Sequence, residues 1–419
     1  MAATTYNVTT SASGVNKIWR KVQGELGVGF GFDVPEYDTM GSLKDYKIDI
    51  SAREITVPLD INEGAGIASI DEGALEAVPS SPNVEELTLN YVLFSGRFTA
   101  SVTAQLLDTY QRAAELKRQM VYQGQKKLQD LARHWGDYFY GLSTGVLCQT
   151  STAATQVSGT YTLTNGYGQS SISNAALIAD KFKVGDRVAL IRSSALVTNA
   201  IGTVTAVTPA TPSIAITWNG SVTSMANDNV VKANSMENTT LVGTDFNRGM
   251  TGLIDMSLTA SVHNLSSGSV PNWSAAYSKT TSGRFSSTEF IRGKQEIAFQ
   301  GGGKADRIIM APGVYRDAIA LQGGVLRFND PLALEMDADL KTNGVKLFQS
   351  KRAPSSWVFM YDSNSIRKLD IMPKPDAPTW GDAVRLIDNS GYVVPISLLT
   401  QLVCLNRKNL AYWSGQTES

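Results

Sequence analysis

The sequence is poor in the side chains that most often carry enzyme chemistry. Its 419 residues include two cysteines, Cys148 and Cys404, and two histidines, His134 and His263. The cysteines lie far apart and match no metal-binding or redox spacing, so we expect two small buried side chains. Neither histidine belongs to a paired-ligand pattern such as HExxH. We therefore expect no catalytic residue, no metal site and no cofactor.

The sequence also lacks a long apolar run and an excess of charge of one sign. No stretch of about 18 apolar residues occurs, so we expect no membrane span. The N-terminal segment MAATTYNVTTSASGVNK has no apolar core and no early basic cluster, so we expect no signal peptide. Lys and Arg number 37 against 38 Asp and Glu, which favours neither a nucleic-acid binder nor a membrane-surface protein.

Basic residues are missing between Arg53 and Arg97. Residues 53–61 and 87–93 alternate apolar and polar side chains, which predicts a long two-stranded ribbon with Pro58 at an edge position. An isolated ribbon is marginal in water, so we expect it to lie on a basic surface of an adjacent copy. A solvated acidic loop is the alternative interpretation. The ribbon has eight acidic candidate contact residues: Glu54, Asp60, Glu63, Asp71, Glu72, Glu76, Glu85 and Glu86.

Proline is missing between Pro82 and Pro209, and this gap contains the strongest helical pattern. Residues 103–142 place apolar side chains mostly at helical spacing, and about 40 helical residues would span roughly 60 Å. The helix is locally basic beside an acidic ribbon. Its candidate contact residues are Arg112, Lys117, Arg118, Lys126 and Lys127.

Composition divides the rest of the chain into further segments of an α+β protein. Residues 148–236 are rich in Ser, Thr, Gly, Ala and Val with short alternating runs, which predicts an inserted small β-barrel or sandwich. The whole division is 1–50, an N-terminal arm with contact candidates Trp19 and Arg20; 51–100, the ribbon; 101–147, the long helix; 148–236, the β-rich domain; 237–355, mixed α and β; 356–395, long strands with a Pro-rich loop at 373–382; and 396–419, a C-terminal strand and tail.

Two local patterns have an enzymatic or metal-binding interpretation. Residues 141–145, GLSTG, fit the G-x-S-x-G pattern, but a nucleophile elbow needs a strand before the serine, and here a helix precedes it. Helix termination by glycine is the simpler interpretation, with a hydrolase using Ser143 as an alternative. The pairs Asp71–Glu72 and Glu85–Glu86 could bind a divalent cation, but they match no EF-hand spacing.

The order of these parts resembles the major capsid proteins of tailed bacteriophages, which have the Hong-Kong-97-type capsid fold. Two stretches carry the resemblance further. FIRGKQEIAFQGGGKADRIIMAPGVYRDAIA (290–320) is similar to the family's helix, glycine turn, strand and second helix, and WGDAVRLIDNSGYVVPISLLTQLVCLNRKNLAYWSG (380–415) is similar to its closing strands. The resemblance makes the segments an N-arm, an extended loop, the spine helix of a peripheral domain, and an axial domain.

The resemblance also implies a function. Copies of the chain would assemble into pentamers and hexamers of an icosahedral head that encloses double-stranded DNA, touching the DNA weakly and without sequence specificity. Portal protein, scaffolding and a possible decoration protein would be the partners. The chain would be part of the virion, assembled in the host cytoplasm without a membrane. Acidic ribbons would meet the basic surfaces 97–133 and 279–307 of neighbours, the latter including Arg284, Arg292 and Lys294.

Three features depart from the family pattern. Some members join subunits through an isopeptide bond from a lysine in the extended loop, and residues 54–96 contain no lysine, so we expect no such bond. No charged helical segment of about 100 residues precedes the arm, so scaffolding should be a separate protein or absent. The segment 148–236 is additional, and we expect it on the outer surface of the shell.

Two other functional classes fit part of the pattern. A tail-tube or decoration protein would also be a phage structural protein, but these are commonly mostly β and lack a long helix. A cellular nanocompartment shell could share the capsid fold. Imaging of the purified protein would separate closed shells from tubes or monomers.

Overall fold

The computed structural model describes a large part of the chain, in segments that fall into two compact units. Residues Met1–Ser42, Val92–Asp137 and Lys368–Thr400 belong to the first unit, and Leu43–Tyr91, Tyr138–Arg367 and Gln401–Ser419 to the second. The described residues are 40–43, 47–49, 54–62, 83–101, 114–151, 153–172, 178–233, 244, 246–268, 270, 273–280, 282–323, 341–342, 344–370, 379–380, 384–385 and 391–417.

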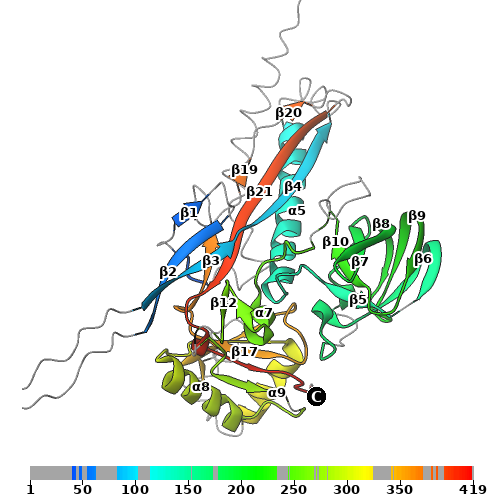
Figure 1. Ribbon diagram of the computed structural model, residues 1–419. Helices are drawn as coiled ribbons and strands as arrows, with labels where there is room; N and C mark the ends of the chain where they lie inside the picture. The colour runs from blue at the N-terminus through cyan, green and yellow to red at the C-terminus, as the bar shows by residue number, and fades with distance from the viewer. Residues whose placement is uncertain are drawn as a thin grey trace, which may run out of the picture. The chain divides into compact units, whose positions relative to one another are not determined.

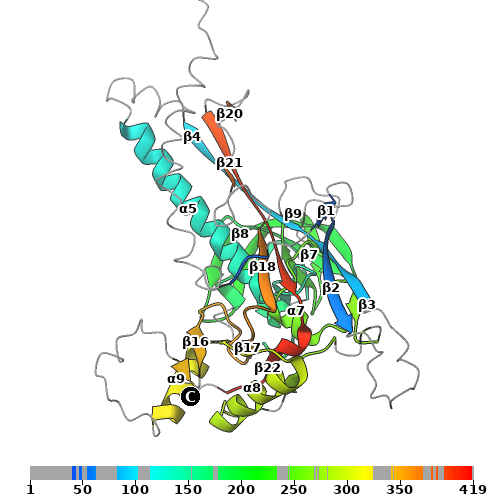
Figure 2. The same cartoon turned by 90° about the vertical axis from the view of Figure 1, so that its left-hand side faces the viewer.

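The first unit is built from a long helix beside a long pair of strands (Figures 1 and 2). Helix α5 (Ala114–Phe139) runs along strand β4 (Val92–Ser101), which pairs antiparallel with β21 (Gly391–Cys404) from Val92↔Thr400 to Ser101↔Gly391. The short strands β18 (Ile366–Asp370), β19 (Thr379–Trp380) and β20 (Val384–Arg385) complete this sheet.

The helix packs on the sheet through one apolar stripe. Leu128, Leu131, Ala132 and Trp135 are buried, at the i, i+3, i+4, i+7 spacing of a single helix face. The His134 ring makes an edge contact with Phe94 (centroids 5.0 Å apart), and the Trp135 indole N–H donates to Thr400 Oγ1 at 3.4 Å. The described helix has 26 residues and ends three residues before the predicted end at Leu142. The described part spans about 39 Å. Residues 103–113 of the predicted helix lie outside the described residues, so the predicted length of 60 Å stays a prediction.

A small three-stranded sheet contains the predicted ribbon in the second unit. It consists of β1 (Lys47–Asp49), β2 (Glu54–Asn62) and β3 (Asn83–Asn90), in that order. The ribbon is shorter than the predicted 51–100, because residues 92–101 pair with β21 and not with β2. The change comes at Tyr91. Before it, odd-numbered Leu87 and Leu89 are buried, whereas after it even-numbered Val92, Phe94 and Phe98 are.

A six-stranded sheet flanked by helices α8 and α9 holds an extensive apolar core in the second unit (Figure 2). Phe290 and Ile297 of α8 meet Ile308, Met310 and Trp413 of the sheet there. Ser286 caps α8 by accepting a hydrogen bond from Glu289 N–H, and Gly302 ends it in the left-handed conformation with φ +65°. The elements are α8 (Ser287–Gly301), α9 (Pro312–Gly323), and, in sheet order, β13 (Tyr277–Lys279), β22 (Leu410–Trp413), β17 (Val358–Tyr361), β14 (Arg307–Met310), β16 (Val345–Gln349) and β15 (Lys341–Thr342).

A closed β-barrel forms within residues 148–236, where the sequence predicts a β-rich domain. Tyr161 and Trp218 pack edge to face at its centre, 5.5 Å apart, and the Trp218 indole N–H donates to the Tyr161 hydroxyl at 2.6 Å. In order around the barrel the strands are β10 (Asn229–Lys232), β5 (Cys148–Thr150), β6 (Ala154–Thr164), β9 (Ser213–Ser224), β8 (Ala195–Thr208) and β7 (Arg187–Arg192). Beyond the barrel come the short α7 (Leu253–Leu258), β11 (Ser261–Val262) and β12 (Leu265–Ser266).

Candidate assembly surfaces

The acidic ribbon is the first candidate surface, and the structure describes part of it. Glu54 lies in β2, half-buried, and Glu86 lies in β3, exposed and opposite Pro58. Because β1 pairs only with Glu54–Thr56, no described strand pairs with Pro58 on its other side, which is where a residue without an N–H is tolerated. Asp60 and Glu85 lie in the strands with side chains outside the description, and Glu63, Asp71, Glu72 and Glu76 lie outside it altogether.

The apolar face of the ribbon is covered by its own chain. Ile55, Val57, Leu87 and Leu89 are each at most 3% exposed. The expectation that the whole ribbon needs a neighbouring copy to cover it is therefore wrong for these side chains. A hydrogen bond also fixes the ribbon's base: Gln401 donates through Nε2 to Asn90 O at 2.6 Å, while its Oε1 accepts from Thr251 N–H at 3.0 Å. Among the described side chains of β2 and β3, Pro58, Glu86 and Asn90 are exposed and Glu54 is half-buried, so the accessible charge at this acidic edge is negative.

The basic helix is the second candidate surface, and it lies in the first unit. Lys126 is exposed, and its ammonium stands 5.9 Å from the ring centre of Tyr122, itself 61% exposed. Lys127 pairs with Asp130 at 3.6 Å, an exposed pair of the kind that contributes little to stability. The side chains of Lys117 and Arg118, and all of Arg112, lie outside the description, as do Trp19 and Arg20 of the arm.

The third candidate surface lies along α8 and the turn before it. Arg284 and Arg292 are exposed and Lys294 is half-buried. The Arg292 guanidinium lies 5.1 Å from the centre of the Tyr277 ring. The surface is therefore cationic along its outer edge.

Glu289, at the first turn of α8, offsets part of this positive charge. Its carboxylate accepts from the Tyr277 hydroxyl at 2.6 Å, from Lys279 at 2.8 Å and from the Trp413 indole at 3.3 Å. Burial pushes the Glu289 pKa upward, but the hydrogen bonds from Lys279, Tyr277 and Trp413 outweigh it, so the pKa is lowered. Glu289 thus stays ionised and orders the start of the helix.

The structure shows an exposed apolar pair on α8 that the sequence pattern does not indicate. Phe290 and Ile297 are buried, but Phe299 is 90% exposed and Ile291 43%. The buried face runs instead through Phe290, Gly293 and Ile297, because Gly293 lies directly under Trp413, where a Cβ would come within 2.4 Å of the indole. The sequence of α8 alone does not show that position 293 faces the core, because this depends on the packing of Trp413 in β22 against the helix.

The GLSTG motif proves to be a close crossing of two backbones. A Cβ on Gly252 would lie within 2.7 Å of Gly141 N, Gly141 O and Phe139 O, and one on Gly249 within 2.6 Å of Leu142 O. Ser143 follows a helix, as expected, and its N–H donates to Asp255 Oδ2 at 3.0 Å. The glycines thus have a packing role that does not involve the Ser143 hydroxyl.

Two cysteines and a histidine in the second unit's interior are held in unreactive forms. Burial raises the pKa of Cys148 and of Cys404 to about 12, so both stay thiols at neutral pH. Burial, with the nearby charge of Arg407, lowers the His263 pKa to about 3, and His263 Nε2 accepts a hydrogen bond from Cys404 N–H at 3.2 Å. That nitrogen is therefore occupied and not available as a general base.

No cluster of three or more His, Cys, Asp or Glu side chains among the described residues could hold a metal ion. No helix in the described part of the chain has both the length and the apolar character to cross a membrane.

Comparisons with known proteins connect this architecture to phage shells. The sequence matches no protein-family model and no curated protein. The structure is similar to a chain of the cyanophage A-1(L) capsid asymmetric unit, with a TM-score of 0.50 and 9% identity, covering 92% of this chain and 93% of that one. A capsid chain of a native GTA particle follows at TM-score 0.43 and 10% identity (92% and 90% covered), and a chain of the satellite phage P4 procapsid at 0.38 and 8% (96% and 90%).

The cyanophage comparison spans nearly all of both chains, so it concerns the whole fold and not one domain. The predicted resemblance to phage capsid proteins is confirmed at the level of the fold, a mixed α and β architecture. This chain therefore shares its fold with a phage capsid protein.

Proposed function

We propose that this chain is the major shell subunit of a phage head, assembling into pentamers and hexamers that enclose double-stranded DNA. The observation that carries the proposal is the fold shared with the cyanophage capsid chain over more than nine-tenths of both chains. Portal, scaffolding and decoration proteins would be the partners, and the virion, assembled in the host cytoplasm, the location. In this role α5 is the spine helix, β2–β3 the extended loop and the barrel an additional outward-facing domain.

Charge supports a specific contact between copies. The ribbon segment 54–96 has acidic residues and no Lys or Arg, whereas Arg284 and Arg292 are exposed beside α8 and Lys126 is exposed on α5. Opposite charges across an interface steer association and fix its register more than they add affinity. The acidic edge of one ribbon would therefore find a basic surface on the next copy. Contacts of this kind weaken as salt rises.

An apolar anchor supports the same contact. Phe299 is 90% exposed on a helix whose other large apolar side chains are mostly buried. Large aromatic side chains are enriched at the energetic centres of protein interfaces. A shell whose subunits are joined without covalent bonds needs such anchors, since residues 54–96 offer no lysine for an isopeptide bond.

Electron microscopy of the purified full-length protein tests the proposal. We expect closed shells with five-fold and six-fold clusters, formed by this chain alone or with a scaffolding protein. Tubes or a persistent monomer under all assembly conditions would reject it. Denatured particles should run as a single band of one subunit's mass on a gel, and a covalent ladder would contradict the non-covalent shell.

A further inference from the structure

Helix α5 has an outward face on the side away from its buried apolar stripe. The exposed side chains of residues 121–139 are Tyr122, Gln125, Lys126 and Gln129. Tyr122, Lys126, Gln129 and the half-buried Arg133 follow one another at the i, i+4, i+7 and i+11 spacing of a single helix face. These four residues, called the donor stripe below, extend over about 17 Å of the helix.

Each member of the donor stripe has a group that can donate a hydrogen bond. The stripe contains a phenol hydroxyl, an ammonium group, a side-chain amide and a guanidinium group. The ammonium of Lys126 lies 5.9 Å from the ring centre of Tyr122, so these two side chains project from the helix side by side. All four groups are common donors to the phosphate oxygens of DNA. Such contacts hold a duplex in place without reading its sequence.

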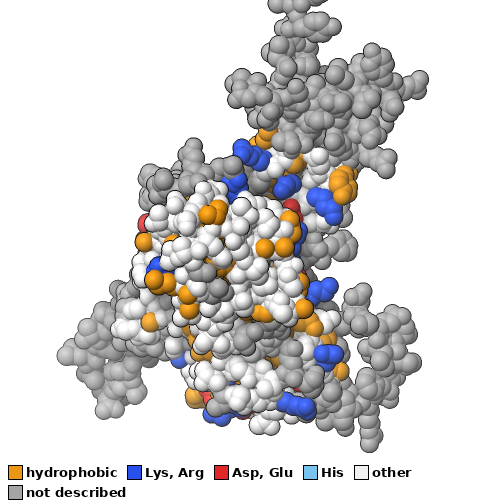
Figure 3. Space-filling view, turned by 90° about the vertical axis from the view of Figure 1, so that its right-hand side faces the viewer, with side chains coloured by type: hydrophobic (Ala, Val, Ile, Leu, Met, Phe, Trp, Pro, Cys, Tyr) orange, Lys and Arg blue, Asp and Glu red, His pale blue; other side chains and the backbone are white. Residues whose placement is uncertain are grey.

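The net charge of this helix face is positive. Lys126 is exposed and forms no ion pair with a residue that the structure describes. Asp130, beside the stripe, pairs with Lys127 at 3.6 Å, so these two residues together add no net charge. In the space-filling view, Lys and Arg side chains gather over α5 and the neighbouring strands of the first unit, with few Asp or Glu side chains among them (Figure 3). A surface of this kind attracts a polyanion.

The surface along α8 suits a protein partner better than the donor stripe does. Beside Arg284 and Arg292, α8 exposes Ile291 and Phe299, by 43% and 90%. The described side chains that are exposed on α5 include no aliphatic one. Interfaces between proteins have an apolar and aromatic centre with charge at the rim. The acidic ribbon of a second copy therefore matches α8, and the donor stripe matches a ligand that is recognised by charge and hydrogen bonds.

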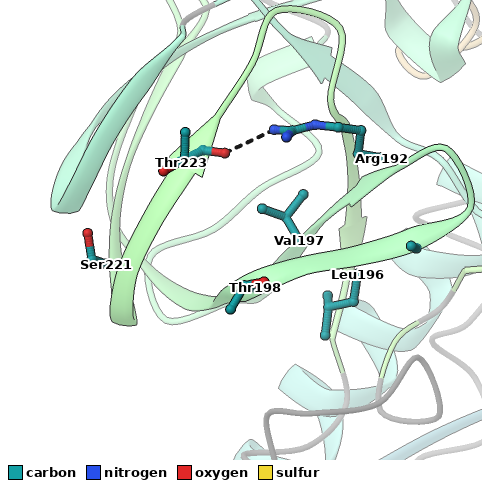
Figure 4. Close-up of a pocket in the computed structure, with 7 residues that line it drawn as sticks. Arg192, Leu196, Val197, Thr198, Ser221 and Thr223 are labelled. Carbon is teal, nitrogen blue, oxygen red and sulfur yellow. Dashed lines mark hydrogen bonds between the residues drawn. The ribbon is translucent and has the colours of Figure 1, made fainter.

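The barrel differs from α5 in its charge. Residues 193–227 contain no Asp, Glu, Lys or Arg. Arg192, just before them, donates to Thr223 O at 2.9 Å (Figure 4) and to the two oxygens of Asp228, each at 2.7 Å. Its charge is therefore compensated by a buried carboxylate. This part of the barrel has little to attract a polyanion.

We propose that the donor stripe of α5 binds the sugar–phosphate backbone of double-stranded DNA without sequence preference. The inference rests on the proposed shell function, which makes packaged DNA the polyanion that the subunit meets. A stripe about 17 Å long reaches only a few phosphates, so one copy binds weakly. Many copies in one shell would hold the same DNA jointly.

Fluorescence anisotropy of a labelled DNA duplex of about 30 base pairs, titrated with the full-length protein over a range of salt concentrations, tests the proposal. Lys126→Gln removes one charge and keeps a side chain that favours helix. It should weaken binding about tenfold at about 50 mM salt and about fourfold at about 200 mM. The slope of log affinity against log salt should fall by about 1. Lys126→Arg should keep the parent slope.

Lys351→Gln is the matched control, because it removes the same charge at an exposed position of the second unit and should leave DNA binding unchanged. The proposal is overturned if the parent protein binds no duplex or if the Lys126→Gln and Lys351→Gln variants bind DNA equally well. It is also overturned if Lys126→Gln blocks assembly without weakening DNA binding, since the stripe would then contact a second copy. Electron microscopy scores assembly separately. A parent protein that forms no shells but binds DNA through Lys126 would reject the shell function and support the stripe.

Discussion

The barrel and the three-stranded ribbon sheet are both built from antiparallel strands, but they differ in how their outermost strands are paired. In the barrel, β10 and β7 pair with each other, so each strand has a neighbour on both sides. In the ribbon sheet, β1 and β3 each pair only with β2 among the strands that the structure describes, so within those strands both outer edges are open. Closure removes edges that could pair with another chain, and an open edge leaves them available. One chain thus contains a module complete in a single copy and another that is not.

The largest expected effect lies inside the closed module. Trp218→Ala removes a ring that is 3% exposed, packed on Tyr161 and hydrogen-bonded to its hydroxyl. We expect the barrel to lose about 3–5 kcal/mol of unfolding free energy. Hydrogen exchange of β8 and β9 measures this loss, and it should not depend on protein concentration. Val157→Ala, at a side chain 54% exposed in the same barrel, is the control and should change little.

The second-largest effect on stability is expected where the backbone at Gly249 and Gly252 crosses the backbone of residues 139–145. Gly252→Ala places a Cβ within 2.7 Å of three backbone atoms. Because backbone cannot move aside as a side chain can, we expect a loss of about 3 kcal/mol, the upper end of the usual cost of overpacking. Ser143→Ala, on the other backbone segment of the crossing, should change the free energy of unfolding by no more than about 0.5 kcal/mol. Equal losses in urea unfolding would contradict the packing role given to the glycines.

A pH titration gives the third effect. The folded pKa of His263 is about 3, below the ordinary value of 6.5, so below pH 6.5 the unfolded chain binds a proton that the folded chain does not. Stability contributed by this group is therefore complete above pH 6.5 and is lost as pH falls toward 3. The loss between pH 7 and pH 5 should be about 2 kcal/mol.

A pair of variants isolates this term from the carboxylates that titrate in the same range. His263→Gln should remove that part of the pH dependence of the urea midpoint, whereas His134→Gln should retain it. If the two variants show the same slope as the parent protein, His263 does not carry the effect.

The smallest effect on a single subunit is expected at the surface left open. Phe299→Ser changes a side chain that is 90% exposed, so subunit stability should shift by no more than about 0.5 kcal/mol. Assembly should nevertheless fail, because the variant removes the proposed anchor between copies. Sedimentation velocity measures the extent of assembly. Gln295→Ser, at an exposed position of the same helix, is the matched polar control. Normal assembly of Phe299→Ser would remove α8 from the proposed interface.

The sequence predicts best those elements whose pattern depends on near neighbours. The alternation in 53–61 predicts β2, because the two faces of a strand differ in burial, and the helix, glycine turn, strand and helix expected in 290–320 correspond to α8, Gly302, β14 and α9. The overall capsid-type architecture also follows from the order of the parts.

Distant partners explain what the sequence could not predict. The switch of buried face at Tyr91 depends on β4 pairing with β21, about 300 residues away in the chain. The exposure of Phe299 depends on Trp413 lying over Gly293. The Arg192–Asp228 pair joins the end of β7 to the turn before β10, which pair when the barrel closes, and no local motif encodes that contact.

The glycine crossing has a consequence for how this chain could be re-engineered. Asn247 N–H donates to Thr144 O at 2.9 Å and Gly249 N–H donates to Ser143 O at 3.1 Å, so the segments that lead into and out of the barrel are joined by adjacent backbone hydrogen bonds. When hydrogen bonds already hold the two ends of an inserted segment together, the entropic cost of closing that loop grows only slowly with the length of the segment. We therefore expect this crossing to tolerate removal or replacement of the inserted segment. Exchanging residues 148–243 for a short Gly/Ser linker should leave the melting temperature of the remaining chain nearly unchanged, and a foreign domain with adjacent termini should be carried there equally well.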